Sequence, residues 1–140
     1  MALVMLKVII ILLYCVIPFS LQSKGTLEIE IVELRNNKGC VLLELLDDND
    51  NSIKGIRKQI VNNTCLITIT DLPAGTYVFK YFHDENNNEE IDSNWIGIPK
   101  EGFGFSNNAK GTFGPPKQEK MIFKFSSDTT MICNPQYLKK

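Results

Sequence analysis

Apolar residues alternate with polar residues in several short stretches of the chain, whereas the 3.6-residue period of a long amphipathic helix is missing from the sequence. In residues 26–34, Leu27, Ile29 and Ile31 alternate with Glu28 and Glu30, which predicts a half-buried strand. Further strands are predicted at residues 40–46, 56–61, 64–70, 76–83, 121–125 and 129–133. The turn-forming residues 36–39 should join the first two strands as a hairpin. Residues 40–46 are apolar on both faces except at Glu44.

This pattern predicts an all-β fold. Seven short strands with turn residues between them are typical of a single antiparallel Greek-key β-sandwich, of the immunoglobulin-like or prealbumin-like kind. Residues 84–120 are then too long for a plain connection, because structureless loops beyond about 12–15 residues are usually functional or disordered. They carry several aromatic residues, so we expect one long ordered loop.

The aromatic residues of this loop allow two interpretations. In the first, Trp95, Phe103 and Phe105 form a platform for a carbohydrate or peptide, with Asn107 and Asn108 beside it. In the second, the aromatic side chains simply pin the loop onto the sandwich, as in many compact loops.

Residues 1–23 have the layout of a secretory signal peptide. Lys7 is the only charged residue before Lys24, and the fourteen residues 8–21 are uncharged. This stretch is shorter than the ~20 apolar residues that span a bilayer, and small or polar residues follow it. We expect an exported protein, secreted or held in the periplasm or cell envelope, with one β-sandwich domain over residues 24–140. The protein would contact the membrane only through the signal segment, before that segment is cleaved. The alternative is that residues 1–23 remain as an uncleaved membrane anchor.

Composition and charge exclude some functions. The chain has 140 residues, which is about the size of one domain, and a net charge of -1. Without Lys7 the mature chain would carry 14 positive and 16 negative groups. Nucleic-acid binding needs a clustered basic face, so we expect no nucleic-acid partner. A single histidine also argues against the usual zinc sites.

Three cysteines remain in the mature chain, Cys40, Cys65 and Cys133. Export would permit a disulfide, but an odd number leaves at least one thiol over, and the sequence does not choose among the three pairings. The alternative is that all three are small, buried apolar side chains.

Four segments carry long and specific motifs. They are Leu72-Pro73-Ala74-Gly75-Thr76-Tyr77, Phe82-His83-Asp84-Glu85-Asn86, Gly97-Ile98-Pro99-Lys100-Glu101-Gly102-Phe103-Gly104-Phe105-Ser106-Asn107-Asn108-Ala109 and Phe113-Gly114-Pro115-Pro116. In these segments the chain resembles a bacterial secreted family called domain of unknown function 2141, and the resemblance runs from about residue 27 to residue 133. It implies an exported protein with a transthyretin-like or carboxypeptidase-regulatory-like β-sandwich, and it implies no particular activity.

Oxygen-bearing side chains recur at alternate positions after His83. Their spacing resembles the first part of a calcium-binding loop, in which hard oxygens converge on one ion. The candidate ligands are Asp84, Asn86, Asn88 and Asp92, together with the backbone carbonyl of Glu90. Glu89 stands where such loops, and the family pattern, have glycine, and Trp95 stands where a bidentate Glu is usual. Calcium is thus the one candidate cofactor, and the alternative is a solvated turn whose Asn and Asp side chains cap the backbone.

His83 is the one candidate for a general base. Adjacent side chains of a strand point to opposite faces, so His83 and Asp84 are not a catalytic pair by adjacency. We expect a hydrogen-bonded histidine at the edge of the core. The alternative is a small hydrolase in which His83 acts with Asp84, Glu101 or Asp92. Tyr77, two residues after Gly75, is a candidate tyrosine corner.

We therefore expect a non-enzymatic, exported binding or accessory module of the cell envelope, with residues 84–120 as its functional face. Its partner would be an envelope protein or a glycan. A purely structural envelope protein is the remaining alternative.

Overall fold

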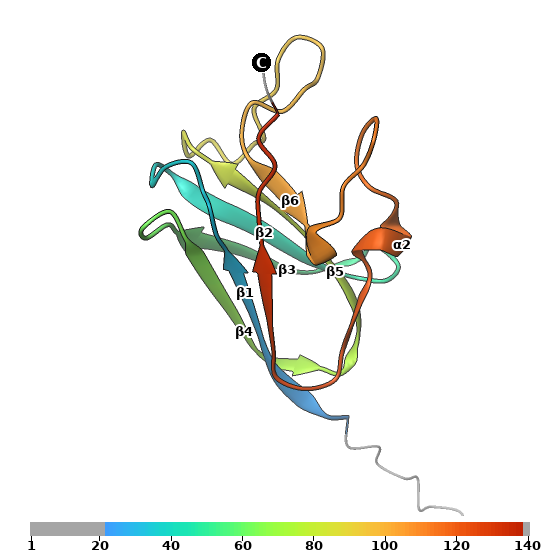
Figure 1. Cartoon of the computed structure of the whole chain (residues 1–140). Coiled ribbons are helices and arrows are strands. Elements are labelled where there is room, and N and C mark those ends of the chain that lie inside the picture. Colours follow the sequence, from blue (N-terminus) through green and yellow to red (C-terminus); the bar gives the residue numbers. More distant parts are fainter. Residues whose placement is uncertain (1–21, 139–140) are drawn as a thin grey trace, which may run out of the picture.

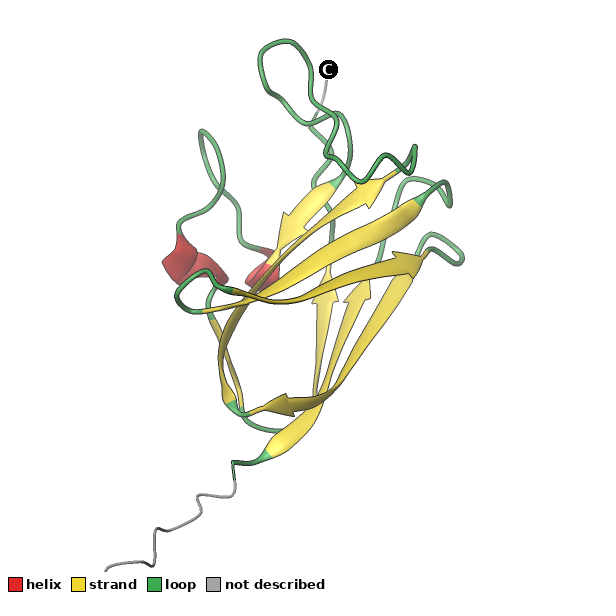
Figure 2. Ribbon diagram, turned by 180° about the vertical axis from the view of Figure 1, so that it is seen from behind, coloured by secondary structure: helices red, strands yellow, loops and turns green. Residues whose placement is uncertain are grey.

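Two sheets pack face to face in the computed structural model (Figure 1, Figure 2). The structure describes residues 22–138, so nearly all of the predicted signal peptide lies outside the described residues. The strands are β1 (Lys24–Ile31), β2 (Cys40–Asp47), β3 (Ser52–Gln59), β4 (Cys65–Pro73), β5 (Gly75–Asp84), β6 (Phe103–Phe105), β7 (Phe123–Phe125) and β8 (Thr129–Cys133), and the short helices are η1 (Ser106–Asn108) and α2 (Gln118–Met121). The predicted β-sandwich is confirmed. Within residues 22–138, no helix is both long enough and apolar enough to cross a membrane.

The smaller sheet has the strand order β4-β1-β8, and the larger sheet has the order β3-β2-β5-β6, with β7 also paired to β5. These pairs are antiparallel except β1 and β8, which run parallel. The parallel pair forms because the chain crosses from β7 in one sheet to β8 in the other through residues 126–128. Asp128 fixes this crossing, since its Oδ1 accepts the N–H of Thr26 at 2.7 Å. The expectation of a wholly antiparallel sandwich is corrected at this pair.

The hairpin predicted between β1 and β2 does not form. β1 pairs with β4 and β8, whereas β2 pairs with β3 and β5, so residues 32–39 cross from one sheet to the other. Each strand has an apolar face, and two such faces are buried best when the strands lie in opposite sheets. The core contains Leu27, Ile29 and Ile31 from β1 and Val41, Leu43 and Leu45 from β2.

The single long loop predicted for residues 84–120 is interrupted. β6 pairs with β5, with Gly104 opposite Tyr81, and η1 and α2 follow. Two loops remain, residues 85–102 and 109–117. The sequence hides β6 because the strand is short and has a glycine at its centre, which strand propensity disfavours. The glycine is needed there, since a Cβ at Gly104 would overlap the ring of Tyr81.

Two further features are found along the larger sheet, one on its core side and one on its outer face. Tyr77 donates its hydroxyl hydrogen to the backbone oxygen of Pro73 at 2.7 Å, so the tyrosine corner is confirmed. A second apolar cluster of Leu46, Val78, Ala109 and Met121 lies outside the main core. In this cluster η1 and α2 cover one end of the outer face of the larger sheet.

The cysteines Cys40, Cys65 and Cys133 are all free and buried. Ile31 of β1 pairs with Cys65 on one side and with Cys133 on the other. Two strand spacings, or about 10 Å, therefore separate these two cysteines, which is too far for a disulfide. Burial raises the pKa of each of these two thiols to about 11, and it also raises the pKa of Cys40. The interpretation as buried apolar side chains fits this arrangement.

In the folded chain from Gln22 onward, we expect a thiol reagent to leave the three thiols unmodified at about pH 8, because buried thiols are protonated and inaccessible. In denaturant all three thiols should react. The pKa of Cys65 and of Cys133 rises from 9.0 to about 11 on folding, so the free energy of unfolding should fall as the pH rises between these values. Rapid labelling of the native protein would contradict the burial.

Candidate functional site

Strand β5 ends in two adjacent polar residues, His83 and Asp84, whose side chains are both fully buried. Because neighbouring side chains of a strand point to opposite faces, His83 shares the core side with Phe79 and Tyr81, and Asp84 points toward loop 85–102. A buried polar group lowers stability unless it is hydrogen-bonded. The partners of these two side chains therefore decide how this end of the molecule is built.

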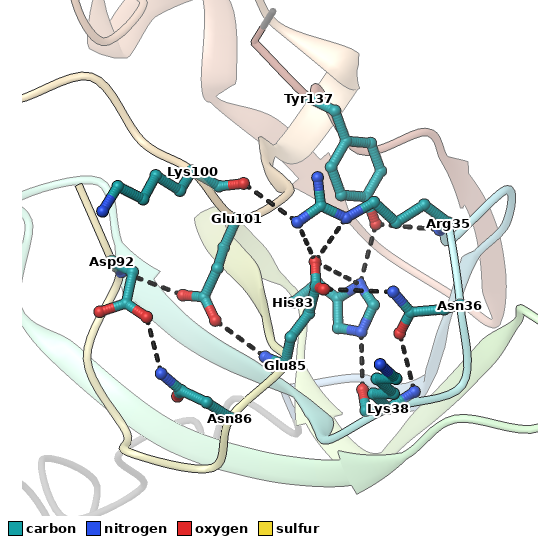
Figure 3. A network of polar contacts seen from close by, with 10 residues as sticks. All are labelled: Arg35, Asn36, Lys38, His83, Glu85, Asn86, Asp92, Lys100, Glu101 and Tyr137. Atoms are coloured by element: carbon teal, nitrogen blue, oxygen red, sulfur yellow. Dashed lines mark hydrogen bonds and ion pairs between the residues drawn. The ribbon is translucent and has the colours of Figure 1, made fainter. Parts of the chain in front are cut away.

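His83 joins segments that lie far apart in the sequence (Figure 3). Its Nε2 lies 2.8 Å from the backbone oxygen of Lys38, and its Nδ1 lies 2.8 Å from the hydroxyl of Tyr137. A carbonyl oxygen only accepts, so Nε2 carries the proton and Nδ1 accepts from Tyr137. The Tyr137 hydroxyl accepts the backbone N–H of Arg35 at 3.1 Å. The expected hydrogen-bonded histidine at the core edge is confirmed.

An ion pair at the surface completes this arrangement. Nε of Arg35 donates to Oε1 of Glu85 at 2.6 Å, and the Arg35 guanidinium lies 4.8 Å from the ring centroid of Tyr137. Nη2 of Arg35 also donates to the backbone oxygen of Lys100 at 3.1 Å. We call Arg35, Lys38, His83, Glu85 and Tyr137 the His83 cluster. It ties the β1–β2 connection, the end of β5 and the C-terminal segment together.

The hydrolase hypothesis needs His83 beside a carboxylate in an open cleft. Both ring nitrogens of His83 are engaged, and the side chain is fully buried. The carboxylate beside it is that of Glu85, 4.0 Å from Nδ1, and not one of the predicted partners Asp84, Asp92 and Glu101. Those three carboxylates instead accept hydrogen bonds from the loop. This geometry leaves His83 without the free ring nitrogen and the open cleft that the hydrolase hypothesis needs.

Asp84 organises the start of loop 85–102 with both of its oxygens. Oδ1 accepts the N–H of Asn88 at 3.1 Å, and Oδ2 accepts the N–H of Glu89 at 3.0 Å. Glu89 has a φ of 64°, the left-handed conformation for which glycine was expected at this position. Its side chain compensates by pairing with Nη1 of Arg57 at 2.8 Å, while Nη2 of Arg57 donates to Oδ1 of Asn87 at 2.8 Å.

The other predicted calcium ligands bond to one another. Nδ2 of Asn86 donates to Oδ2 of Asp92 at 2.7 Å, and Nδ2 of Asn88 donates to Oδ1 of Asp92 at 3.3 Å. Oδ1 of Asn88 accepts the N–H of Glu90 at 3.0 Å. The structure thus brings Asp84, Asn86, Asn88 and Asp92 together, but in hydrogen bonds. Within the described part of the chain, no group of three or more His, Cys, Asp or Glu residues is placed to hold a metal ion.

Glu101 braces the same loop from its far end. Its side chain is buried, and its two oxygens accept the N–H groups of Glu85 at 2.8 Å and Asp92 at 3.0 Å. Together, Asp84 and Glu101 satisfy four backbone N–H groups that no strand would satisfy. This is the backbone capping that was the alternative to calcium, and the melting experiment below decides whether the loop binds calcium as well.

A groove lies on the outer face of the larger sheet. Its floor comes from β2, β3, β5 and β6, and its walls come from the two loops and residues 136–138. It encloses about 640 Å³, within the ~300–1,000 Å³ range of ligand pockets. The apolar side chains that line it include Leu42, Phe82, Ile91, Phe103, Phe105 and Leu138. The outer face of an antiparallel sheet is normally polar, so this apolar floor marks a candidate binding site.

The residues predicted to bind a ligand are only partly brought together. Phe103 and Phe105 line the groove. Trp95 lies in the same loop as the groove residues Gly97 and Pro99, but its side chain is 95% exposed and is not part of the wall. It therefore lies beside the groove rather than in it.

Asn107 and Asn108 serve a structural role at η1. Nδ2 of Asn107 donates to the backbone oxygens of Lys120 at 3.2 Å and Ile122 at 2.9 Å. Nδ2 of Asn108 donates to the backbone oxygen of Ile132 at 3.0 Å. These bonds fasten η1 to its neighbours, so the structure does not bring the two amides into the groove.

Leu42 and Phe82 belong to the groove floor but were not predicted as site residues. A signal for them exists in the sequence, because residues 40–46 are apolar on both faces except at Glu44. A strand that is apolar on both faces indicates a second covered or binding surface outside the main core. The pairing of Leu42 with Phe82 across β2 and β5 appears only once the register is known.

The fold and the groove together define a small β-sandwich domain with a ligand-sized apolar groove on one sheet. The chain belongs to the family described as "Uncharacterized protein conserved in bacteria (DUF2141)", whose model matches residues 29–133. The match includes the His83–Glu101 region and most of the groove. A comparison with curated proteins found no match.

We expect the melting temperature of the chain from Gln22 onward to be equal in EDTA and in millimolar calcium, because protein N–H groups already occupy the oxygens of Asp84 and Asp92. An ion at 100 times its Kd would add about 2.7 kcal/mol and raise the melting temperature by several degrees. Such a rise, if lost in Asp92→Ala, would show that the loop is the calcium site its spacing predicts.

Proposed function

We propose that this protein is a non-enzymatic, exported binding module whose ligand lies in the groove on the outer face of the larger sheet. The groove is the observation that carries the proposal. Its volume of about 640 Å³ suits a small ligand or part of a larger one. Its floor is built from strands, which position a binding surface more rigidly than loops do.

The apolar floor supports binding rather than a purely structural role. Phe82, Phe103 and Phe105 are only partly buried, although each could have been polar without cost to the main core. An exposed contiguous apolar surface is a liability for a soluble domain unless it is covered in use. A ligand that covers these rings would remove that liability.

The export part of the proposal rests on the sequence. Residues 1–23 have the charge and apolar layout of a signal peptide, which favours a secreted, periplasmic or cell-envelope location. The buried side chain of His83, with both nitrogens bonded, favours a binding role over hydrolysis. An envelope protein or glycan that presents an apolar segment is one source of ligand.

Gly55→Phe should block the groove without disturbing the fold. Gly55 lies opposite Glu44 in the β2–β3 pair, lines the groove, and has no atom within 4 Å of the position of an added Cβ. We expect the wild-type chain from Gln22 onward to bind an apolar fluorescent dye such as ANS saturably, and Gly55→Phe to weaken binding at least about tenfold by occupying the site.

Thr68→Phe is the matched control, because Thr68 is an exposed position of β4 in the smaller sheet. It adds the same aromatic ring to the other side of the sandwich and should leave dye binding unchanged. If wild type and both variants bind the dye alike, or if none binds it, the groove is not a binding site. That result would favour the alternative of a purely structural envelope protein.

A further inference from the structure

The groove offers a ligand few free hydrogen-bonding groups. Its polar lining residues are Glu44, Lys80, Tyr81, Thr112 and Gln136, of which Tyr81 is buried in the main core. Lys80 already lies 3.8 Å from Oδ1 of Asp50, and Nε2 of Gln136 donates to the backbone oxygen of Ala109 at 3.4 Å. The backbone of the two central floor strands is occupied too, because β2 pairs with β3 and β5, and β5 pairs with β2 and β6.

This lining discriminates among ligand chemistries. A sugar would place several hydroxyl groups against the rings of Phe82, Phe103 and Phe105 without enough partners, and unpaired buried hydroxyls are costly. A peptide strand over the middle of the floor would need free backbone partners, which β2 and β5 do not supply, because each of them is paired on both sides. A flexible hydrocarbon chain needs no hydrogen bonds at all. The groove therefore suits an unbranched apolar chain best.

The two walls differ in charge, and this indicates the polar end of such a ligand. Residues 106–124 carry four lysines and one glutamate, whereas residues 85–102 carry five acidic residues and one lysine. Lys110 and Lys117 flank the groove residues Gly111 and Pro115, and within residues 22–138 neither makes an ion pair. An anionic head group would be favoured on this side and repelled on the other.

We propose that the groove binds the acyl chain of a single, dispersed anionic amphiphile of the fatty-acid class. This inference rests on the proposed function and names the ligand of the same site. The acyl chain of the ligand lies over Leu42, Phe82 and Phe105, between the two loops that project from the sandwich in Figure 2. The carboxylate stays in water near Lys110 and Lys117. Trp95 and Phe113 are 95% and 101% exposed in the two loops that form the walls.

The test is displacement of the groove-bound dye from the chain starting at Gln22, which contains both sheets and the whole described core. Saturated fatty acids of about 8 to 14 carbons are titrated below their micelle concentration. At ~0.8 kcal/mol per buried methylene, each added pair of methylenes should tighten binding roughly tenfold until the groove is full. Gly55→Phe should lose this binding, and Thr68→Phe should keep it.

Trp95 supplies a second readout that needs no dye. It is the only tryptophan of the chain, and it shares loop 85–102 with the groove residues Gly97 and Pro99. Fatty acid should change its emission or its quenching by iodide in the wild type and in Thr68→Phe, but not in Gly55→Phe. The double variant Lys110→Gln, Lys117→Gln should weaken binding of the acid a few-fold and leave binding of the alcohol of equal length unchanged.

Each other outcome overturns a distinct part of the account. Dye binding that Gly55→Phe blocks, but that no fatty acid of any length competes with, would overturn the ligand class and leave the proposed function standing. Absence of dye binding and of fatty-acid binding would overturn both. Binding to anionic phospholipid vesicles that persists in Gly55→Phe, without binding of dispersed fatty acid, would mean that the exposed loop aromatics dock on a membrane, and would overturn the proposal.

Discussion

The end of the molecule that carries the candidate site depends on one constraint. Two adjacent polar side chains at the end of β5 are buried on opposite sides of the larger sheet, and both must be hydrogen-bonded. His83 meets it on the core side with the carbonyl of Lys38 and the hydroxyl of Tyr137. Asp84 meets it on the outer side with two N–H groups of loop 85–102. An unpaired buried group would cost about 1–3 kcal/mol, so these segments cannot leave their partners cheaply. Gly39 belongs to the same constraint, because a Cβ at this residue would overlap the backbone of Asp84.

The groove is a consequence of this arrangement. Loop 85–102 is held at one end by Asp84 and at the other by Glu101, so it stands as a wall instead of collapsing onto the outer face of the sheet. At the opposite end of that face, η1 and α2 bury Leu46 and Val78. The apolar surface between loop 85–102 and the two short helices stays uncovered, and we propose this surface as the binding site.

The sequence was sufficient for local features and insufficient for those that depend on pairing between distant segments. Alternation located the strands, and Gly75 and Tyr77 indicated the corner that forms. The predicted β1–β2 hairpin was wrong because alternation gives which face of a strand is buried but not which sheet it joins. β6 was missed because three residues around Gly104 carry too little local preference. The spacing of the polar residues from Asp84 to Asp92 correctly identified a turn. The same spacing is compatible with a metal site and with hydrogen bonds among Asn amides and carboxylates, so the partners of these side chains could be assigned only from the structure.

The most direct test of this account is amide hydrogen exchange, measured by NMR on the chain from Gln22 onward. The N–H groups of Glu85, Asn88, Glu89 and Asp92 lie in a surface loop, yet each donates to Asp84 or Glu101. We expect all four to exchange much more slowly than exposed amides do, and Asp84→Ala to release Asn88 and Glu89 selectively. Exchange of these four amides at the rate of an unstructured peptide would contradict the claim that buried carboxylates hold the wall of the groove.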